Sequence, residues 1–193
     1  MAKKKNTQQQ PGAAYNFMDV GDREERHTFA VLVANEPGVL ARVIGLFSGR
    51  GYNIESLTVT EVDDDANLSR ITIVTDGTTQ VLAQIRNLLE RLVPVHRVED
   101  LTAVAEGRSM EPPVQRELAL VKVVGVGDKR VEALRIADIF KAEVVDTGLG
   151  HFVFEIKGRK SQIDRFITLM MPLGLAEICR SGVIAVSRGD QAL

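Results

Sequence analysis

Apolar and polar residues alternate along the first half of the chain in blocks that predict four strands and two helices. Apolar or alternating runs predict the strands, over residues 28–34, 52–62, 68–75 and 94–101. Helical spacing of apolar residues predicts one helix after Asn35-Glu36-Pro37-Gly38 and a second helix capped by Thr78. The resulting order, β-α-β-β-α-β, is the ferredoxin-like arrangement, so we expect a four-stranded antiparallel sheet with both helices on one face.

The second half of the chain repeats this order, although the two sequences scarcely resemble each other. Strands are predicted over residues 118–124, 144–145, 152–156 and 178–186, with helices over 131–140 and from a capping Ser161 to 170. Residues 103–117 lose all periodicity and contain Pro112-Pro113. We therefore expect an α+β chain with two ferredoxin-like βαββαβ domains, at residues 27–102 and 118–190, a linker at 103–117 and a disordered tail at 1–26.

The first predicted sheet needs cover on the face that its helices leave open. The side chains expected on that face are not all polar, so the face would expose apolar surface to water in a single copy. Pairing with a second copy of the chain is the simplest remedy, and we expect a homodimer.

Composition and charge narrow the class of protein. The chain carries 24 Lys and Arg against 26 Asp and Glu, a net charge of -2, which gives no reason to expect nucleic acid as a partner. No run approaches the roughly 18 apolar residues of a membrane span, and the N-terminus lacks the apolar core of a secretion signal. The single cysteine, Cys179, lies in a predicted strand, where we expect a small buried apolar side chain. These features favour the cytoplasm.

The sequence contains no recognisable catalytic or metal-binding motif. His27, His96 and His151 lie on or beside separate predicted strands, and no His, Cys or Glu spacing is typical of a metal site. Residues 125–130 (GVGDKR) follow a strand and precede a helix, but Arg130 occupies the third glycine position of a dinucleotide fingerprint. We expect no catalytic residue, no metal site and no cofactor in this chain.

One segment has the chemistry to bind a small ligand. A helix that begins after Gly38 presents unpaired N–H groups and the positive end of its dipole, which suit a carboxylate. Asn35 offers an amide oxygen to an ammonium group, and Val39 and Leu40 offer apolar side chains. Together these groups match a small apolar α-amino acid, although the same residues also fit a plain capped helix.

Residues 42–57 (RVIGLFSGRGYNIESL) resemble the signature of the small regulatory subunit of acetohydroxyacid (acetolactate) synthase. With residues 35–40 they are similar to the N-terminal ACT domain of that family. Further matches to its pattern, which extend the resemblance over roughly residues 27–190, are Ser69-Arg70, Arg180-Ser181-Gly182-Val183 and Ser187-Arg188-Gly189.

The resemblance implies a non-catalytic partner of a larger enzyme. In this family a large catalytic subunit carries thiamine diphosphate, Mg²⁺ and FAD and condenses two pyruvates to 2-acetolactate, the first common step of branched-chain amino acid biosynthesis. The small subunit has no active site. It activates the large subunit and confers feedback inhibition by valine or another branched-chain amino acid, leucine or isoleucine.

The resemblance also implies which residues bind the effector. Two ACT domains pair in this family, and each effector site lies at their interface. One protomer would contribute Asn35, Gly38, Val39 and Leu40, and the other Asn53 and Ile54. Pro37 replaces a serine that is frequent there, which stiffens the turn and leaves Gly38 in place. The alternative is a stand-alone amino-acid-binding ACT regulator, against which stands the lack of a helix-turn-helix or basic stripe.

Overall fold

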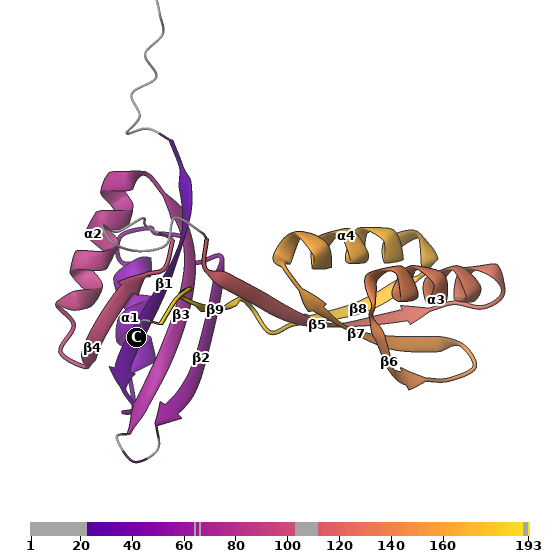
Figure 1. Cartoon of the computed structure of the whole chain (residues 1–193), viewed down its shortest axis with the longest axis horizontal. Helices are drawn as coiled ribbons and strands as arrows, with labels where there is room; N and C mark the ends of the chain where they lie inside the picture. Colours follow the sequence, from indigo (N-terminus) through magenta and orange to yellow (C-terminus); the bar gives the residue numbers. More distant parts are fainter. Residues whose placement is uncertain (1–22, 64, 66, 103–111, 191–192) are drawn as a thin grey trace, which may run out of the picture.

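The computed structural model of the chain describes residues 23–63, 65, 67–102, 112–190 and 193. It shows two sheets, each with two helices on one face, arranged side by side along the long axis of the molecule (Figure 1). The N-terminal sheet stands upright in this view, and the C-terminal domain extends from the side opposite α1 and α2. The α+β class and both ferredoxin-like domains predicted from the sequence are confirmed.

The N-terminal domain follows the predicted order of strands and helices. Its elements are β1 (Glu25–Ala34), α1 (Val39–Ser48), β2 (Ser56–Asp63), β3 (Leu68–Gly77), α2 (Thr79–Glu90) and β4 (Val95–Asp100). The strands are antiparallel in the order β2-β3-β1-β4, which leaves β2 and β4 at the edges. Thr78 caps α2 as predicted, because its side chain accepts a hydrogen bond from the Val81 N–H.

The second strand starts later than the sequence pattern predicts. We expected it from Tyr52, but β2 begins at Ser56 and residues 52–54 form a loop after α1. The N–H of Tyr52 donates to the carbonyl oxygen of Phe47, which holds the chain against the end of the helix. Gly51 makes the turn with a φ of +69°, a conformation that favours glycine.

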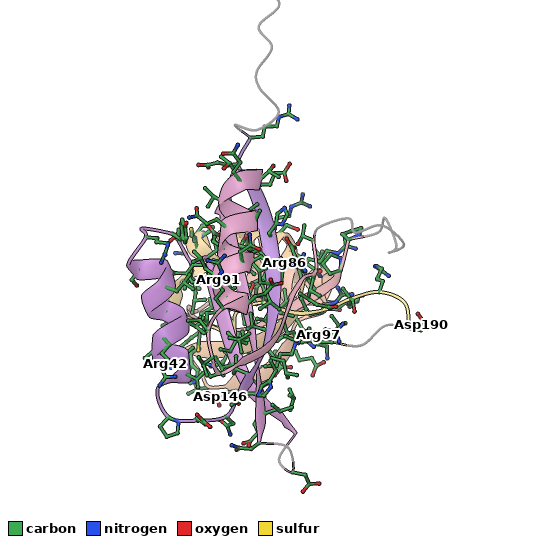
Figure 2. All side chains as sticks on the ribbon, turned by 90° about the vertical axis from the view of Figure 1, so that its left-hand side faces the viewer. Arg42, Arg86, Arg91, Arg97, Asp146 and Asp190 are labelled. Carbon is green, nitrogen blue, oxygen red and sulfur yellow. The ribbon has the colours of Figure 1, made fainter. Side chains whose placement is uncertain are left out.

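The N-terminal core lies between the sheet and the inner sides of its two helices. Its largest fully buried side chains are Phe29, Phe47, Ile71, Ile73, Ile85 and Leu89. Figure 2 shows α1 and α2 together on the near face, with Arg42 on α1, Arg86 on α2 and Arg91 just after the end of α2. These three arginines are exposed, so their charges meet water.

The C-terminal domain has the same topology with one additional strand. Its elements are β5 (Val114–Val124), α3 (Asp128–Phe140), β6 (Glu143–Thr147), β7 (His151–Gly158), α4 (Lys160–Met170), the 3₁₀ helix η2 (Met171–Leu173), β8 (Leu175–Arg180) and β9 (Ile184–Val186). The sheet order is β6-β7-β5-β8, and β9 pairs with the first residues of β5. The strand β5 therefore begins four residues before the predicted strand, and it forms a ribbon with β9.

The final predicted strand, residues 178–186, is interrupted. The break between β8 and β9 includes Gly182, whose φ is +80°. A Cβ at this position would lie 2.9 Å from both Ser56 Oγ and Thr58 Cγ2, so only glycine fits against β2. The chain bends here because it crosses from the C-terminal sheet onto the N-terminal sheet.

The outer face of the N-terminal sheet is partly covered by this same crossing segment. Ala185 of β9 packs with Ala30 and Leu101 in a small apolar cluster, and its carbonyl oxygen accepts a 2.6 Å hydrogen bond from Arg70 Nη2. Burial lowers the pKa of the Arg70 guanidinium, and the nearby Glu99 opposes that shift. The open face, our reason to expect a second copy, is thus partly filled by the chain itself.

Two local predictions in the C-terminal domain are wrong. Cys179 is exposed, because it stands opposite Leu120 on the face of the second sheet that no helix covers. Ser161 does not cap the last helix, because α4 already begins at Lys160 after Arg159, and no side chain caps it.

Candidate functional site

The start of α1 is an open helix terminus. Gly38 precedes the helix with a φ of +86°, and no side chain caps it. The Val39 N–H donates to the Glu36 carbonyl oxygen at 3.3 Å, and the Arg42 N–H donates to the Gly38 carbonyl oxygen at 3.1 Å. In the described part of the chain, the N–H groups of Leu40 and Ala41 have no backbone acceptor. Two such donors at the positive end of a helix dipole form a seat for a carboxylate.

Asn35 is held beside this seat by two residues that sequence reasoning missed. Its backbone N–H donates to the Asn67 carbonyl oxygen at 2.7 Å, and Asn67 Nδ2 donates to the Asn35 carbonyl oxygen at 3.3 Å. Its side-chain Nδ2 donates to Glu61 Oε1 at 2.8 Å. The Glu61 carboxylate brings a negative charge close to Asn35, which suits an ammonium group. The sequence pattern contains no signal for this pair, because it depends on the placement of β2.

The two predicted apolar residues differ in exposure. Val39 is buried in the N-terminal core, whereas the side chain of Leu40 is 37% exposed at the surface. Ile44, one turn further along α1, is exposed to a similar degree. The accessible apolar surface near the helix start therefore comes from Leu40 and Ile44.

Asn53 and Ile54 lie at the opposite end of α1. The Asn53 carbonyl oxygen accepts a 2.6 Å hydrogen bond from Thr75 Oγ1, and Thr75 is fully buried in β3. Ile54 is half-buried against the N-terminal core. A helix of this length spans about 15 Å, so one chain does not bring these two residues to Asn35 and Gly38. The six predicted residues form two separate groups in a single copy.

Two histidines in the described chain contact carboxylates, at two separate places. His27 Nδ1 lies 2.6 Å from Asp100 Oδ2, and this hydrogen bond raises the pKa of the His27 imidazole. His151 Nε2 lies 3.0 Å from Asp146 Oδ2 on the other sheet, at a separate site. Over the described ranges, no group of three or more His, Cys, Asp or Glu side chains is placed to hold a metal ion. No helix in those ranges is long and apolar enough to cross a membrane.

The geometry thus defines a ferredoxin-like α+β domain joined to a second domain of the same topology. Residues 29–97 match the family model "AHAS small subunit-like ACT domain", and residues 116–189 match "Small subunit of acetolactate synthase". Together the two matches span most of the described chain.

Relatives extend the similarity over the length of the chain. A probable acetolactate synthase small subunit from Archaeoglobus fulgidus is 43% identical over 168 residues, 86% of this chain and 99% of that protein. The small subunit from Haemophilus influenzae is 43% identical and covers 86% of this chain and 98% of its own. The crystal structure of the Thermotoga maritima small subunit superposes with a TM-score of 0.75 at 34% identity, and covers 86% of this chain and 99% of that chain.

The chain belongs to the acetolactate synthase small subunit family. It is therefore a regulatory, non-catalytic subunit in branched-chain amino acid biosynthesis, and it works with a large catalytic subunit.

Proposed function

We propose that this chain activates the large catalytic subunit of acetolactate synthase and makes it sensitive to feedback inhibition by a branched-chain amino acid, with valine as the first candidate. The thiamine diphosphate, Mg²⁺ and FAD of the reaction then belong to the large subunit, which joins two pyruvates into 2-acetolactate. The observation that carries the proposal is the open N-terminus of α1 beside Asn35 and Glu61.

An α-amino acid fits the groups at the start of α1. Its carboxylate would accept hydrogen bonds from the Leu40 and Ala41 N–H groups, and its ammonium would lie between Glu61 and the amide oxygen of Asn35. Leu40 offers apolar surface to a short branched side chain. Valine, leucine and isoleucine differ by a methylene or a branch point, which changes binding by only about 1–3 kcal/mol. All three are therefore candidates.

A second copy of the chain would complete this site. The strand β2 is at the edge of its sheet, and Val59 and Val62 on it are 44% and 49% exposed. If two β2 strands pair antiparallel about a two-fold axis, the start of each strand lies beside the end of the other. That arrangement brings Asn53 of one copy toward Glu61 and Asn35 of its partner. The separation of the two residue groups within one chain supports this homodimer.

Inhibition would follow from a shift between two arrangements of the dimer. The effector stabilises one arrangement, and the large subunit binds and is activated by the other. A coupling of about 1–3 kcal/mol between the two ligands is sufficient for about 5–150-fold inhibition. Coupling of this kind is reciprocal, so the activated complex should bind valine less tightly than the free chain does.

The domain boundaries drawn from the sequence form part of this proposal. Residues 27–102 would bind the effector and pair, residues 103–117 would connect, and residues 118–190 would form the second domain. The two family matches, over residues 29–97 and 116–189, support that division. Most of the tail at residues 1–26 lies outside the described residues. We place the protein in the cytoplasm on the sequence features given above.

The deciding experiment measures acetolactate formation from pyruvate. Three samples are compared, the chain alone, its large subunit alone and the two together, each with and without valine, leucine or isoleucine. We expect no activity from the chain alone, a higher rate in the mixture, and inhibition by at least one of the amino acids in the mixture only. Light scattering on the purified chain should give two copies per particle.

Two results would count against the proposal. A large subunit whose rate and inhibition are unchanged by the chain would exclude the regulatory role. If the chain nevertheless bound valine, a stand-alone amino-acid sensor would become the favoured function in place of the regulatory subunit. A monomer at micromolar concentration, with or without valine, would exclude the shared site.

A further inference from the structure

The loop that carries Asn53 and Ile54 continues directly into a contact with the C-terminal domain. Glu55 follows these two residues, and its Oε2 lies 2.9 Å from Lys160 Nζ and 3.0 Å from Arg26 Nη2. Lys160 is the first residue of α4 in the C-terminal domain, and Arg26 lies on β1 of the N-terminal sheet. One carboxylate is therefore bound by a cation from each domain, and only about a quarter of its side chain is exposed.

The next residue, Ser56 at the start of β2, makes a second contact across the same boundary. Ser56 Oγ accepts a 2.8 Å hydrogen bond from the Val183 N–H, and Thr58 Oγ1 donates to the Val183 carbonyl oxygen at 3.3 Å. Gly182 packs against both side chains so closely that a Cβ would collide with them. Both backbone polar groups of the buried Val183 are thus satisfied by the first residues of β2.

The C-terminal side of these contacts is connected through Arg180. Arg180, just before Gly182, binds Glu117 of β5 through two hydrogen bonds and Asp164 of α4 through a third. The helix that begins with Lys160 and the segment that contains Val183 are therefore linked through Arg180. Any displacement of Glu55 and Ser56 acts on two points of one connected unit.

We propose that residues Glu55 and Ser56 transmit the effector signal from the loop at Asn53 and Ile54 to the C-terminal domain, through Lys160 and Val183. The inference rests on the proposed function, because it assumes an effector at that loop. When the loop closes on the effector, Glu55 and Ser56 move with it. The C-terminal domain then shifts so that Lys160 and Val183 stay in contact with these two residues. Lys160 and Gly182 are positioning residues, since neither belongs to the effector site.

The test uses the full-length chain with its large subunit. Lys160→Ala removes one contact, and Gly182→Ala forces Ser56 and Thr58 away from the segment at Val183. Lys160→Arg keeps the cation and should restore the wild-type response. Lys122→Ala is the matched control, because Lys122 pairs with Glu177 inside the C-terminal domain alone, at 3.5 Å.

Two quantities separate transmission from a structural role. Calorimetry gives the valine Kd with and without the large subunit, and the two values should differ about 5–150-fold for the wild type. We expect Lys160→Ala and Gly182→Ala to bind valine within about twofold of the wild type when free, and to activate the large subunit normally. Their two Kd values should converge, and maximal inhibition should fall at least threefold. The Lys122→Ala control should behave as the wild type.

The outcomes distinguish this inference from the function on which it rests. Wild-type inhibition in both variants would overturn the transmission route. Loss of activation together with loss of inhibition would also overturn it, because that result indicates a failure of assembly. A wild-type chain that neither binds a branched-chain amino acid nor affects the large subunit would instead refute the proposed function.

Discussion

Arg180 of β8 binds the buried carboxylate of Glu117 on the neighbouring strand β5 with two hydrogen bonds, Nε to Oε1 at 2.7 Å and Nη2 to Oε2 at 2.6 Å. Its remaining nitrogen, Nη1, donates to Asp164 of α4 at 2.6 Å. Bonding to the Glu117 carboxylate raises the pKa of the Arg180 guanidinium above its ordinary value. The three side chains together join two strands and a helix at the point where the C-terminal domain meets the N-terminal sheet.

We expect Arg180→Met to destabilise the chain strongly. The substitution leaves the Glu117 carboxylate, only 5% exposed, without its cation, and breaking a buried pair from one side costs about 3–5 kcal/mol. Urea unfolding measures the loss. Lys141→Ala is the control, because its pair with Asp138 is more than 80% exposed and surface pairs contribute about 0–1 kcal/mol. Equal losses in the two variants would contradict this account of Arg180.

The His27–Asp100 pair should make the stability of the N-terminal domain depend on pH. Asp100 raises the pKa of His27, so the folded state binds the proton more tightly than the unfolded state does. The stabilisation is complete below the ordinary value of 6.5 and is lost as the pH rises through the raised pKa. Urea unfolding between pH 5.5 and 9 should show this decline for the wild type relative to His27→Asn. An identical slope in the variant would exclude His27 as the cause.

A charge at the start of α1 should abolish feedback inhibition. Gly38→Asp places a carboxylate where the carboxylate of the amino acid is expected, in space that holds no atom within 4 Å of a Cβ. Gly38→Asn is the matched control, because it has the same shape and the same strain at a positive φ, about 1–2 kcal/mol, without the charge. We expect the Gly38→Asp variant to bind valine with a Kd at least tenfold higher than that of the Gly38→Asn variant. Equal valine affinities in the two variants would show that the effector carboxylate does not bind at Gly38.

A buried residue should also affect effector binding. Thr75 is fully buried, and its hydroxyl holds the Asn53 carbonyl oxygen at 2.6 Å. Thr75→Val preserves the volume and removes this bond, at a cost of about 1–3 kcal/mol in stability. If the loop must be held in place to bind the effector, valine affinity should fall several-fold. Thr72→Val, on the other face of β3, is the control and should leave affinity unchanged.

Most of the fold was predictable because its signals are local. The order of the elements, the start of α1 after Gly38 and the Thr78 cap each depend on residues within one or two turns of one another. The same holds for the helix-start part of the candidate site, residues 35–40. The predicted strand at Tyr52 was wrong, because a half-buried loop and a strand have the same apolar pattern over a few residues.

The sequence by itself thus determined the two ferredoxin-like domains, the family resemblance and the two groups of candidate effector residues. Only the tertiary structure decided what those residues touch. Asn35 is hydrogen-bonded to Glu61, which is 26 residues away in the sequence, and Ser56 to Val183, which is 127 residues away. The exposure of Cys179 and the break at Gly182 likewise depend on which sheet faces are covered. Local periodicity encodes the direction in which a side chain points, whereas partners far apart in the chain are set by strand register and by the docking of one domain on the other.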